Sequence, residues 1–348
     1  MKNVKIGNKI VGDGNPCLIS LEPGSTFTNI DEAIKLTSFT AKSGANAVKF
    51  QTLRVGDAER YMAIKDIKID FTTPSGKKQE LMLGAIKRKE LSDDDWKRIR
   101  KYSKELGLIF IATPAFPETV DLLEDLKVDA LKVSKGDINN VLLIEKMAQT
   151  QIPIILDARE KFSDVDKGIE ICKQNDNDQI IIMHCPSGYP VENSGVHLKA
   201  ISAIKEKYDY PVGFADHSYG DLMNYPAIAL GVNMLEKTIT LDKNVEKTEH
   251  FMSLEPQELK PFIENIRAVE QAMGDANILN SSRVPNNARR SFVAKTDIKI
   301  GEILSRSNLD YKRPGDLGIP TSEGFNLLGK KAKQNIKKET VLQWEMFE

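Results

Sequence analysis

The 348-residue sequence predicts an α/β protein, in which a (β/α)8 TIM barrel is followed by a small β-rich domain. Two observations carry this prediction. Eight short apolar runs alternate with helical segments, and continuous apolar strands flanked by helices are typical of a parallel sheet. Eight such units favour a closed barrel of ~250 residues over an open doubly wound sheet, and the remaining length allows a second domain.

The expected elements follow in regular order along the chain. One helix is expected to begin after the N-cap candidate Asn29 and to end at Gly44. A second is expected to begin at the N-cap candidate Ser92 and to end at Gly107. The expected strands span residues 17–22, 45–51, 108–113, 129–134, 153–157, 179–184, 211–215 and 232–235. The expected helices span residues 30–43, 92–107, 119–126, 141–150, 163–174, 196–207 and 255–273.

Two stretches interrupt this alternation. The segment from Thr52 to Lys89 is long, charged and weakly periodic, so we expect an excursion over one face of the fold, for which a lid is one possible role. Residues 275–290 are rich in Asn and Ser and predict a linker between a barrel domain at 1–274 and a domain at 291–348. Short apolar runs with Gly and Pro turns predict that the latter is β-rich.

Composition excludes several classes of protein. Hydrophobic residues make up 41% and charged residues 28%, and the formal net charge is -1, which favours a soluble globular protein and gives no reason to expect nucleic acid. Cys17, Cys172 and Cys185 lack CxxC spacing, which argues against a disulfide framework and a cysteine zinc site. The N-terminus has no apolar signal-peptide region and no run approaches ~18 apolar residues, so we expect a cytoplasmic protein without a membrane partner.

Polar residues gather at the ends of the expected strands, where parallel α/β proteins bind ligands. They are Ser20, Glu22, Lys49, Gln51, Thr113, Lys132, Ser134, Lys135, Asp157, Arg159, His184, Ser187, Asp216, His217, Glu236 and Lys237. Lysines at one barrel mouth are costly unless an anion or carboxylates compensate them. Two interpretations therefore stay open: an anionic substrate, such as a phosphate or carboxylate, or structural networks in which Glu22, Asp157 and Glu236 neutralise the lysines.

The four histidines receive different interpretations. His217 follows Asp216 just beyond a strand, which favours a ligand-binding or acid/base role. His184 ends an apolar strand and fits a hydrogen-bonded core histidine as well as a catalytic one. His197 and His250 lie in polar surroundings, so we expect both at the surface.

Motifs along the whole chain resemble the sialic acid synthase family, which makes nonulosonic acids. In the barrel they are SGANAVKFQTL (43–53), ATP (112–114), the segment 131–156, HCPSGYP (184–190), PVGFADHS (211–218), EKTITLDKN and HFMSLEPQEL (between 236 and 259). Further on, VAKTDIKIGEIL, YKRPGDLGIPTS and LLGKKAKQNIKKETVL resemble the antifreeze-like SAF domain, a β-clip-like fold.

The resemblance implies an enzyme that condenses phosphoenolpyruvate with the open-chain aldehyde of an N-acetylated sugar such as N-acetylmannosamine. It also implies a divalent metal, Mn or Mg, that activates the aldehyde. A further implication is a domain-swapped homodimer, in which the C-terminal domain of one chain lies over the barrel mouth of the other and supplies Arg313. The residues that match family positions are Lys49, Gln51, Thr113, Lys132, Tyr189, His217, Arg313 and Glu249, the last at the position of a sugar-contacting acid.

Several positions depart from the family pattern. Ser20 occupies the position of the family's acid at the reacting centre; Glu22 lies two residues later on the same strand face and is a candidate replacement. His217 matches the first of two metal-binding histidines, but Thr238 occupies the second position, which puts the metal in doubt because a hydroxyl is a poor replacement for imidazole. Further changes fall at Lys135, Asp157 to Arg159, Gly188 and Ala215.

These observations lead to assigned roles and three functional hypotheses. Glu22, Lys49, Lys132 and His217 are the expected catalytic residues, and His217 is also the expected metal ligand. The expected substrate-binding residues are Gln51, Thr113, Lys135, Asp157, Arg159, Tyr189, Glu236, Glu249 and Arg313. The hypotheses are a nonulosonic acid synthase-like enzyme with altered metal and phosphate contacts, an aldolase or lyase that uses Lys132 or Lys49 as a Schiff-base amine, and a non-catalytic sugar-binding or regulatory paralogue.

Overall fold

The computed structural model describes residues 2–280, 288–313, 315 and 317–348. The chain forms two compact units, Met1–Gly274 and Asp275–Glu348. Among the described residues, no helix combines the length and apolar character needed to cross a membrane.

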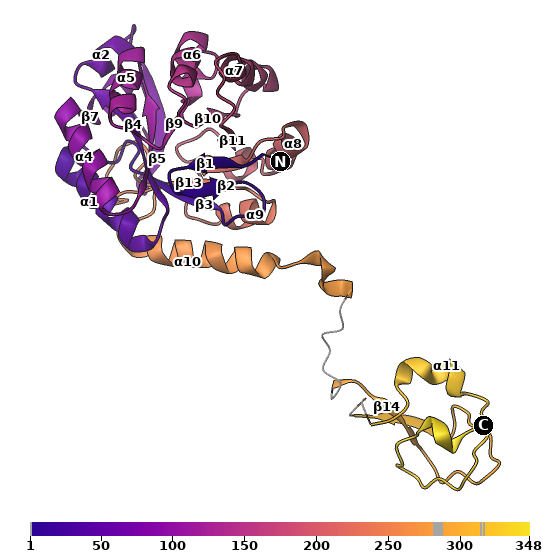
Figure 1. Ribbon diagram of the computed structural model, residues 1–348. Helices are drawn as coiled ribbons and strands as arrows, with labels where there is room; N and C mark the ends of the chain where they lie inside the picture. The colour runs from indigo at the N-terminus through magenta and orange to yellow at the C-terminus, as the bar shows by residue number, and fades with distance from the viewer. Residues whose placement is uncertain (1, 281–287, 314, 316) are drawn as a thin grey trace. The chain divides into compact units, whose positions relative to one another are not determined.

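The first unit is a closed barrel of eight parallel strands, which confirms the predicted fold class (Figure 1). The strands are β3 (Leu18–Glu22), β4 (Ala47–Arg54), β8 (Ile109–Pro114), β9 (Ala130–Lys132), β10 (Ile154–Asp157), β11 (Ile180–His184), β12 (Val212–Asp216) and β13 (Met234–Thr238). Each strand pairs with the next, and β3 pairs with both β4 and β13, so the sheet closes on itself. The short strand β7 (Glu90–Leu91) extends the end of β4.

Helices surround the strands, and their ends follow the predicted capping signals. They are α1 (Ile30–Ser43), α4 (Asp93–Glu105), α5 (Pro117–Asp125), α6 (Val141–Gln149), α7 (Phe162–Gln174), α8 (Lys199–Lys207), α9 (Asn224–Ala229) and α10 (Pro256–Met273). The Asn29 side chain accepts a hydrogen bond from the amide of Glu32 at 3.0 Å, and the Ser92 hydroxyl accepts one from the amide of Asp95 at 3.1 Å. Gly44 ends α1 in the left-handed conformation, with φ of 86°.

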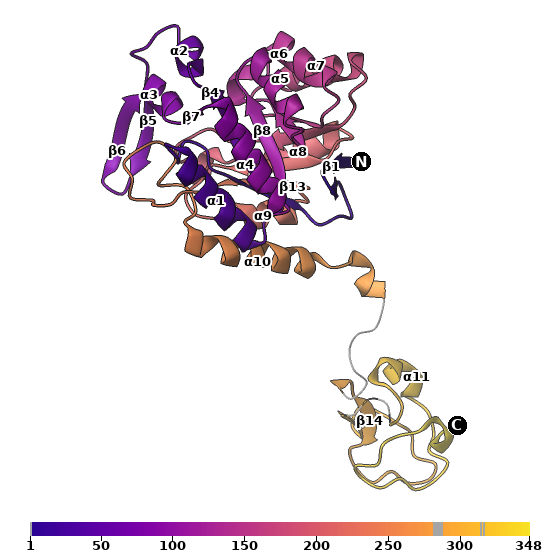
Figure 2. The ribbon, with the colours of Figure 1, turned by 60° about the vertical axis from the view of Figure 1, so that its left-hand side comes forward.

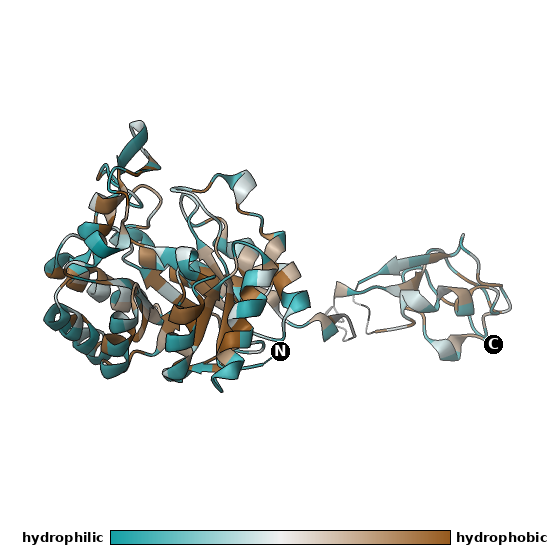
Figure 3. Cartoon of the chain, turned by 90° about the horizontal axis from the view of Figure 1, so that it is seen from above, coloured by the Kyte–Doolittle hydropathy of each residue, from teal (hydrophilic) through white to brown (hydrophobic). Residues whose placement is uncertain are grey.

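The amino-terminal end of the barrel is filled by a hairpin that the sequence did not reveal. Strands β1 (Val4–Ile6) and β2 (Lys9–Val11) pair antiparallel, and their buried side chains join the apolar cluster inside the barrel. Figure 3 shows that hydrophobic residues concentrate on the barrel strands, while the outer helices are mixed. Apolar packing thus occupies the amino-terminal end, and the polar strand ends lie at the carboxyl-terminal end.

The excursion between β4 and α4 forms a wall beside the barrel mouth. It consists of α2 (Asp57–Tyr61), the antiparallel strands β5 (Lys68–Thr73) and β6 (Gly76–Leu81), and α3 (Met82–Lys87) (Figure 2). The amide of Thr72 donates to the carbonyl of Tyr189 at 2.8 Å, and the amide of Thr248 donates to the Glu80 carboxylate at 2.8 Å. The hairpin is therefore tied to the loops that follow β11 and β13.

The second unit is small and rich in short strands, as predicted. Strand β14 (Ser291–Ala294) pairs antiparallel with β15 (Leu309–Lys312), and isolated bridges such as Ile298↔Ile336 connect the remaining extended segments. Its short helices are η5 (Thr321–Glu323), α11 (Gly324–Leu327) and η6 (Trp344–Met346). Within the expected linker, residues 276–280 form a short 3-10 helix, whereas residues 281–287 lie outside the described residues.

Candidate active site

A cavity of about 420 Å³ lies at the carboxyl ends of the barrel strands. It brings together twelve of the residues that the sequence assigned to catalysis or substrate binding, which are Glu22, Lys49, Gln51, Thr113, Lys132, Lys135, Asp157, Arg159, Tyr189, His217, Glu236 and Glu249. Arg313 is the exception; it is exposed on the second unit. The excursion contributes a further side of the lining through residues that include Tyr61, Ile69, Met82 and Lys89.

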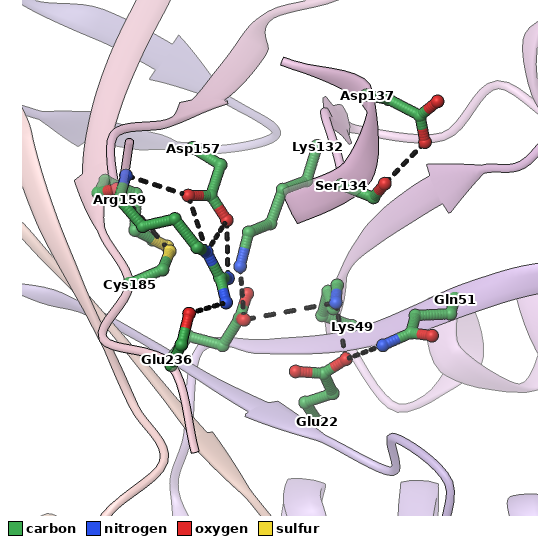
Figure 4. Close-up of polar contacts among 12 residues, drawn as sticks. Glu22, Lys49, Gln51, Lys132, Ser134, Asp137, Asp157, Arg159, Cys185 and Glu236 are labelled. Carbon is green, nitrogen blue, oxygen red and sulfur yellow. Dashed lines mark hydrogen bonds and ion pairs between the residues drawn. The ribbon is translucent and has the colours of Figure 1, made fainter. Parts of the chain in front are cut away.

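Four buried charges alternate across the barrel interior (Figure 4). The Lys49 amine is hydrogen-bonded to Glu22 and lies 3.9 Å from Glu236, which in turn is hydrogen-bonded to the Lys132 amine. Burial alone would raise the pKa of Glu22, but Lys49 and Lys132 outweigh it and lower that pKa. Although burial opposes it, the neighbouring carboxylates Glu236 and Glu22 raise the pKa of Lys132. Carboxylates therefore compensate these two lysines without any ligand.

Asp157 and Arg159 form a second pair at the end of β10. The Arg159 Nε lies 2.9 Å from both Asp157 carboxylate oxygens, and Nη2 lies 2.6 Å from Oδ2. Arg159 Nη1 also donates to the Ser187 hydroxyl at 3.3 Å. Asp157 thus has its own guanidinium partner. Lys135 is exposed at the rim, and within the described residues it forms no ion pair.

The charges that line the cavity balance. Its cations are Lys49, Lys89, Lys132, Lys135 and Arg159, and its carboxylates are Glu22, Asp137, Asp157, Glu236 and Glu249. Because carboxylates match the cations in number, the lysines at the strand ends do not by themselves indicate an anionic ligand. What matters is which charges are already paired inside the protein.

His217 presents a neutral imidazole to the cavity. Burial lowers the pKa of His217 to about 3, and the charge of Arg159 adds to this effect. Its ring centre lies 5.9 Å from that of Tyr189, and its Nδ1 has no hydrogen-bond partner among the described residues. A neutral ring with an unpartnered nitrogen can take part in a hydrogen bond or ligate a metal, whereas its lowered pKa makes it a weak base.

The residues present do not fit the two-histidine metal site implied by the resemblance. Thr238, at the second position, has a buried hydroxyl without a partner among the described residues, and Glu22 already accepts from Lys49 and Gln51. Within the described chain, no three His, Cys, Asp or Glu side chains are arranged to hold an ion. The site thus offers one imidazole, that of His217, where the resemblance implies two.

Some strand-end residues have structural roles. The His184 Nε2 is hydrogen-bonded to the carbonyl of Val196 at 2.8 Å, and this histidine does not line the cavity. The Lys237 amine lies 2.9 Å from Asp216 and donates to the carbonyl of Ser218 at 2.7 Å, in a fully buried pair. These contacts show that His184, Lys237 and Asp216 take part in hydrogen bonds and ion pairs within the barrel core.

Lys89 is a cavity residue that the sequence reasoning missed. It is 5% exposed, and its amine donates to the amide oxygen of Gln51 and, at 3.2 Å, to the Ser25 hydroxyl. Ser25 also donates its backbone amide to Glu249. No local signal separates Lys89 from the other lysines of the excursion, because its burial depends on the hairpin that folds beside it.

His250 is buried, so its expected surface position is wrong. It is 6% exposed, and its Nδ1 lies 2.8 Å from the Thr240 hydroxyl and 3.2 Å from the carbonyl of Asp242. Burial lowers the pKa of His250 to about 4. The polar sequence around it was misleading because the segment after β13 folds back over the barrel. His197 is exposed, as predicted.

The burial of His250 predicts a loss of stability in acid. Its folded pKa, about 4, lies below the ordinary value of about 6.5, so the unfolded chain binds the extra proton. The neutral His250 therefore contributes fully to the free energy of unfolding above about pH 6.5, and this contribution is lost as the pH falls towards 4. At pH 5 the loss is about 1–2 kcal/mol. Urea unfolding at pH 7.5 and 5 should show a smaller pH effect in His250→Gln than in the parent. His197→Gln is the exposed control, and equal pH effects in all three proteins would contradict the prediction.

Comparison with known proteins adds an independent finding. Residues 36–278 match the NeuB family, and residues 289–348 match the SAF domain. An uncharacterized protein of Methanocaldococcus jannaschii is 34% identical over 99% of this chain and 98% of its own length. The N,N'-diacetyllegionaminic acid synthase of Campylobacter jejuni is 34% identical over 94% of this chain and 98% of its own. A solved structure with the same fold is that of N-acetylneuraminic acid (sialic acid) synthetase from Leptospira borgpetersenii in complex with citrate. The structural match has a TM-score of 0.70 and 25% sequence identity, and it covers 82% of this chain and 92% of the synthetase chain.

Proposed function

This chain belongs to the NeuB family, as the resemblance of its motifs indicated, and from that premise we propose that it is a phosphoenolpyruvate-dependent synthase. It condenses phosphoenolpyruvate with the open-chain aldehyde of an N-acetylated amino sugar to give a nonulosonic acid. The observation that carries this proposal is the convergence of Glu22, Lys49, Lys132 and His217 in one cavity. Relatives named as acid synthases over nearly the whole length of the chain support the same reaction class.

The proposed reaction forms one carbon–carbon bond and releases phosphate. Carbon 3 of phosphoenolpyruvate attacks the aldehyde carbon, water adds to carbon 2, and phosphate leaves. Glu22 is placed to accept the proton of the attacking water as the bond to carbon 2 forms. Lys49 and Lys132 lower its pKa, which keeps it ionised but makes it a weak base until that bond forms. Lys132 and Arg159 place positive charge near the reacting anion. The contacts are altered relative to the family because Asp157 shares the charge of Arg159 and Thr238 replaces an imidazole.

The contacts favour this synthase over a lysine-dependent aldolase. A Schiff base requires a deprotonated amine, and enzymes obtain one by placing the lysine among apolar groups or other cations. Here Lys49 and Lys132 each contact a buried carboxylate, and the pKa of Lys132 is raised. Borohydride treatment with a 2-keto acid is accordingly expected to label neither lysine.

Phosphate release tests the proposed function directly. The full chain is incubated with phosphoenolpyruvate and a panel of amino-sugar aldehydes, with and without Mn²⁺ or Mg²⁺. Phosphate and a new 2-keto acid should form only when phosphoenolpyruvate and an accepted aldehyde are both present. No release across the panel would reject the synthase, and sugar binding without turnover would then favour the non-catalytic paralogue.

We also propose that the enzyme acts as a homodimer in which Arg313 of one copy completes the barrel mouth of the other. The exposed position of Arg313 on the SAF domain leaves its guanidinium available for such a role. Sedimentation equilibrium of the full chain measures the assembly state.

A further inference from the structure

The excursion side of the cavity has an apolar lining with one cation in it. Ile69, Met82, Ala85 and Ile86 line this side, and Lys89 follows them in the chain. Lys89 immediately precedes β7, whose Glu90 pairs with Leu53 of β4, so its backbone is fixed to the barrel sheet. The barrel thus fixes the backbone next to Lys89, and the side chain is held by Gln51 of β4 and by Ser25.

Lys89 differs from the other buried lysines in its contacts. In the described part of the chain, Lys49, Lys132 and Lys237 each contact a carboxylate, whereas Lys89 has no carboxylate within 4.0 Å. Its acceptors, the Gln51 amide oxygen and the Ser25 hydroxyl, are neutral. Burial lowers the pKa of Lys89, and the charges of Glu249 and Glu22, which lie beyond 4.0 Å, offset this only in part. An anion bound directly to the amine would stabilise its charged form.

Lys89 also has hydrogen-bonding capacity to spare. An ammonium group carries three donors, and the described residues occupy two of them. Gln51, which accepts from Lys89, uses its Nε2 to donate to Glu22 at 3.3 Å. A ligand held by Lys89 would therefore lie one side chain away from the carboxylate assigned to the reaction.

We propose that Lys89 binds a carboxylate on the acceptor, so that the preferred acceptor is an acidic amino-sugar aldehyde of the uronic acid type. This inference rests on the proposed function and specifies its second substrate. The apolar side chains beside Lys89 pack against the sugar's N-acetyl methyl and carbon atoms, and the single cation selects its acid group.

The charges around Lys89 favour a carboxylate over a phosphate. A phosphate monoester carries a charge of about -1.5 to -2 at pH 7, while a carboxylate carries one negative charge. Lys89 supplies one positive charge, and the carboxylates Glu249 and Glu22 already act on it from beyond 4.0 Å. The second charge of a phosphate would add to the negative charge of these two carboxylates, so a monoanion is the better match.

The experiment compares three matched acceptors that differ at one carbon: an N-acetylated hexosamine, its 6-phosphate and its 6-carboxylate. The full chain should show a kcat/KM about 10- to 100-fold higher for the carboxylate than for the neutral sugar, which is the range of one hydrogen bond to a charged group. In Lys89→Met this ratio should fall towards one, mainly through KM. Lys87→Met, at an exposed site in the same segment, should keep the preference.

A binding measurement separates this inference from the proposed function. Calorimetric titration with the N-acetylhexosaminuronic acid, without phosphoenolpyruvate, should show binding that weakens about 10- to 100-fold in Lys89→Met. If this loss occurs but no acceptor is turned over, the subsite stands and the synthase proposal fails. If neutral or phosphorylated acceptors are preferred, or Lys89→Met keeps the carboxylate preference, the subsite is rejected while the synthase proposal stands.

Discussion

Lys132→Met is expected to lower the free energy of unfolding by about 3–5 kcal/mol and to abolish measurable phosphate release. The substitution keeps most of the side-chain volume, but it leaves Lys49, at 3.9 Å, as the remaining ion-pair partner of the buried Glu236 among the described residues. Burial already raises the pKa of Glu236, so this carboxyl can take up a proton when its partner is lost. The destabilisation should therefore be smaller at pH 6 than at pH 8, as measured by urea unfolding.

The double variant Lys132→Met/Glu236→Leu distinguishes stability from function. It removes both charges, so most of the lost stability should return, because an unpaired buried charge is the main cost of the single change. Phosphate release should not return if Lys132 acts on the substrate. Lys146→Met is the control, because its partner Asp121 is exposed and the loss should stay below about 1 kcal/mol. Recovery of turnover in the double variant would show that the pair is structural alone.

The barrel was predictable from the sequence because its signals are local. Apolar runs such as residues 179–184 are long enough to identify a buried strand, and side chains such as Asn29 and Ser92 cap helices through contacts three residues away. The strand ends then bring distant residues together by topology. Glu22, Lys49 and Lys132 face the same cavity because all strands of a parallel barrel end on one side.

What could not be predicted depends on contacts between segments far apart in the chain. The hairpin β1–β2 is too short to show a strand pattern, yet its buried residues Val4, Ile6 and Val11 fill the barrel end. Lys89 and His250 are buried by neighbouring loops, and polar sequence around them hides this. The choice between an anionic substrate and internal pairing likewise required the distances between side chains.

The structure explains two of the departures from the family pattern. Asp157 introduces a charge, but Arg159 compensates it with three short contacts, so the pair entails no uncompensated buried charge. Gly188 stands where the family has asparagine. A Cβ atom there would lie 2.4 Å from the Val191 Cα, so the loop as it runs here excludes a side chain.

Glu22→Gln is expected to reduce kcat for phosphate release by about 10²- to 10⁴-fold, the usual contribution of an acid/base group. Glutamine keeps the shape and can still accept from Lys49 and Gln51, but it cannot take a proton from water. Ser20→Ala is the matched control, since the Ser20 hydroxyl has no partner among the described residues and its loss should change kcat only a few-fold.

The double variant Ser20→Glu/Glu22→Ser exchanges the two residues and tests which position of β3 must carry the carboxylate for phosphate release. The exchange moves the carboxylate about 6.7 Å along the strand, away from Gln51 and deeper into the barrel. Ser20 is the direct neighbour of Glu236 in the sheet, so the moved carboxylate would meet a like charge there. We therefore expect activity no higher than that of Glu22→Gln, together with lower stability in urea. Recovery to within about tenfold of the parent would instead place the required acid at position 20 and remove Glu22 from the reaction.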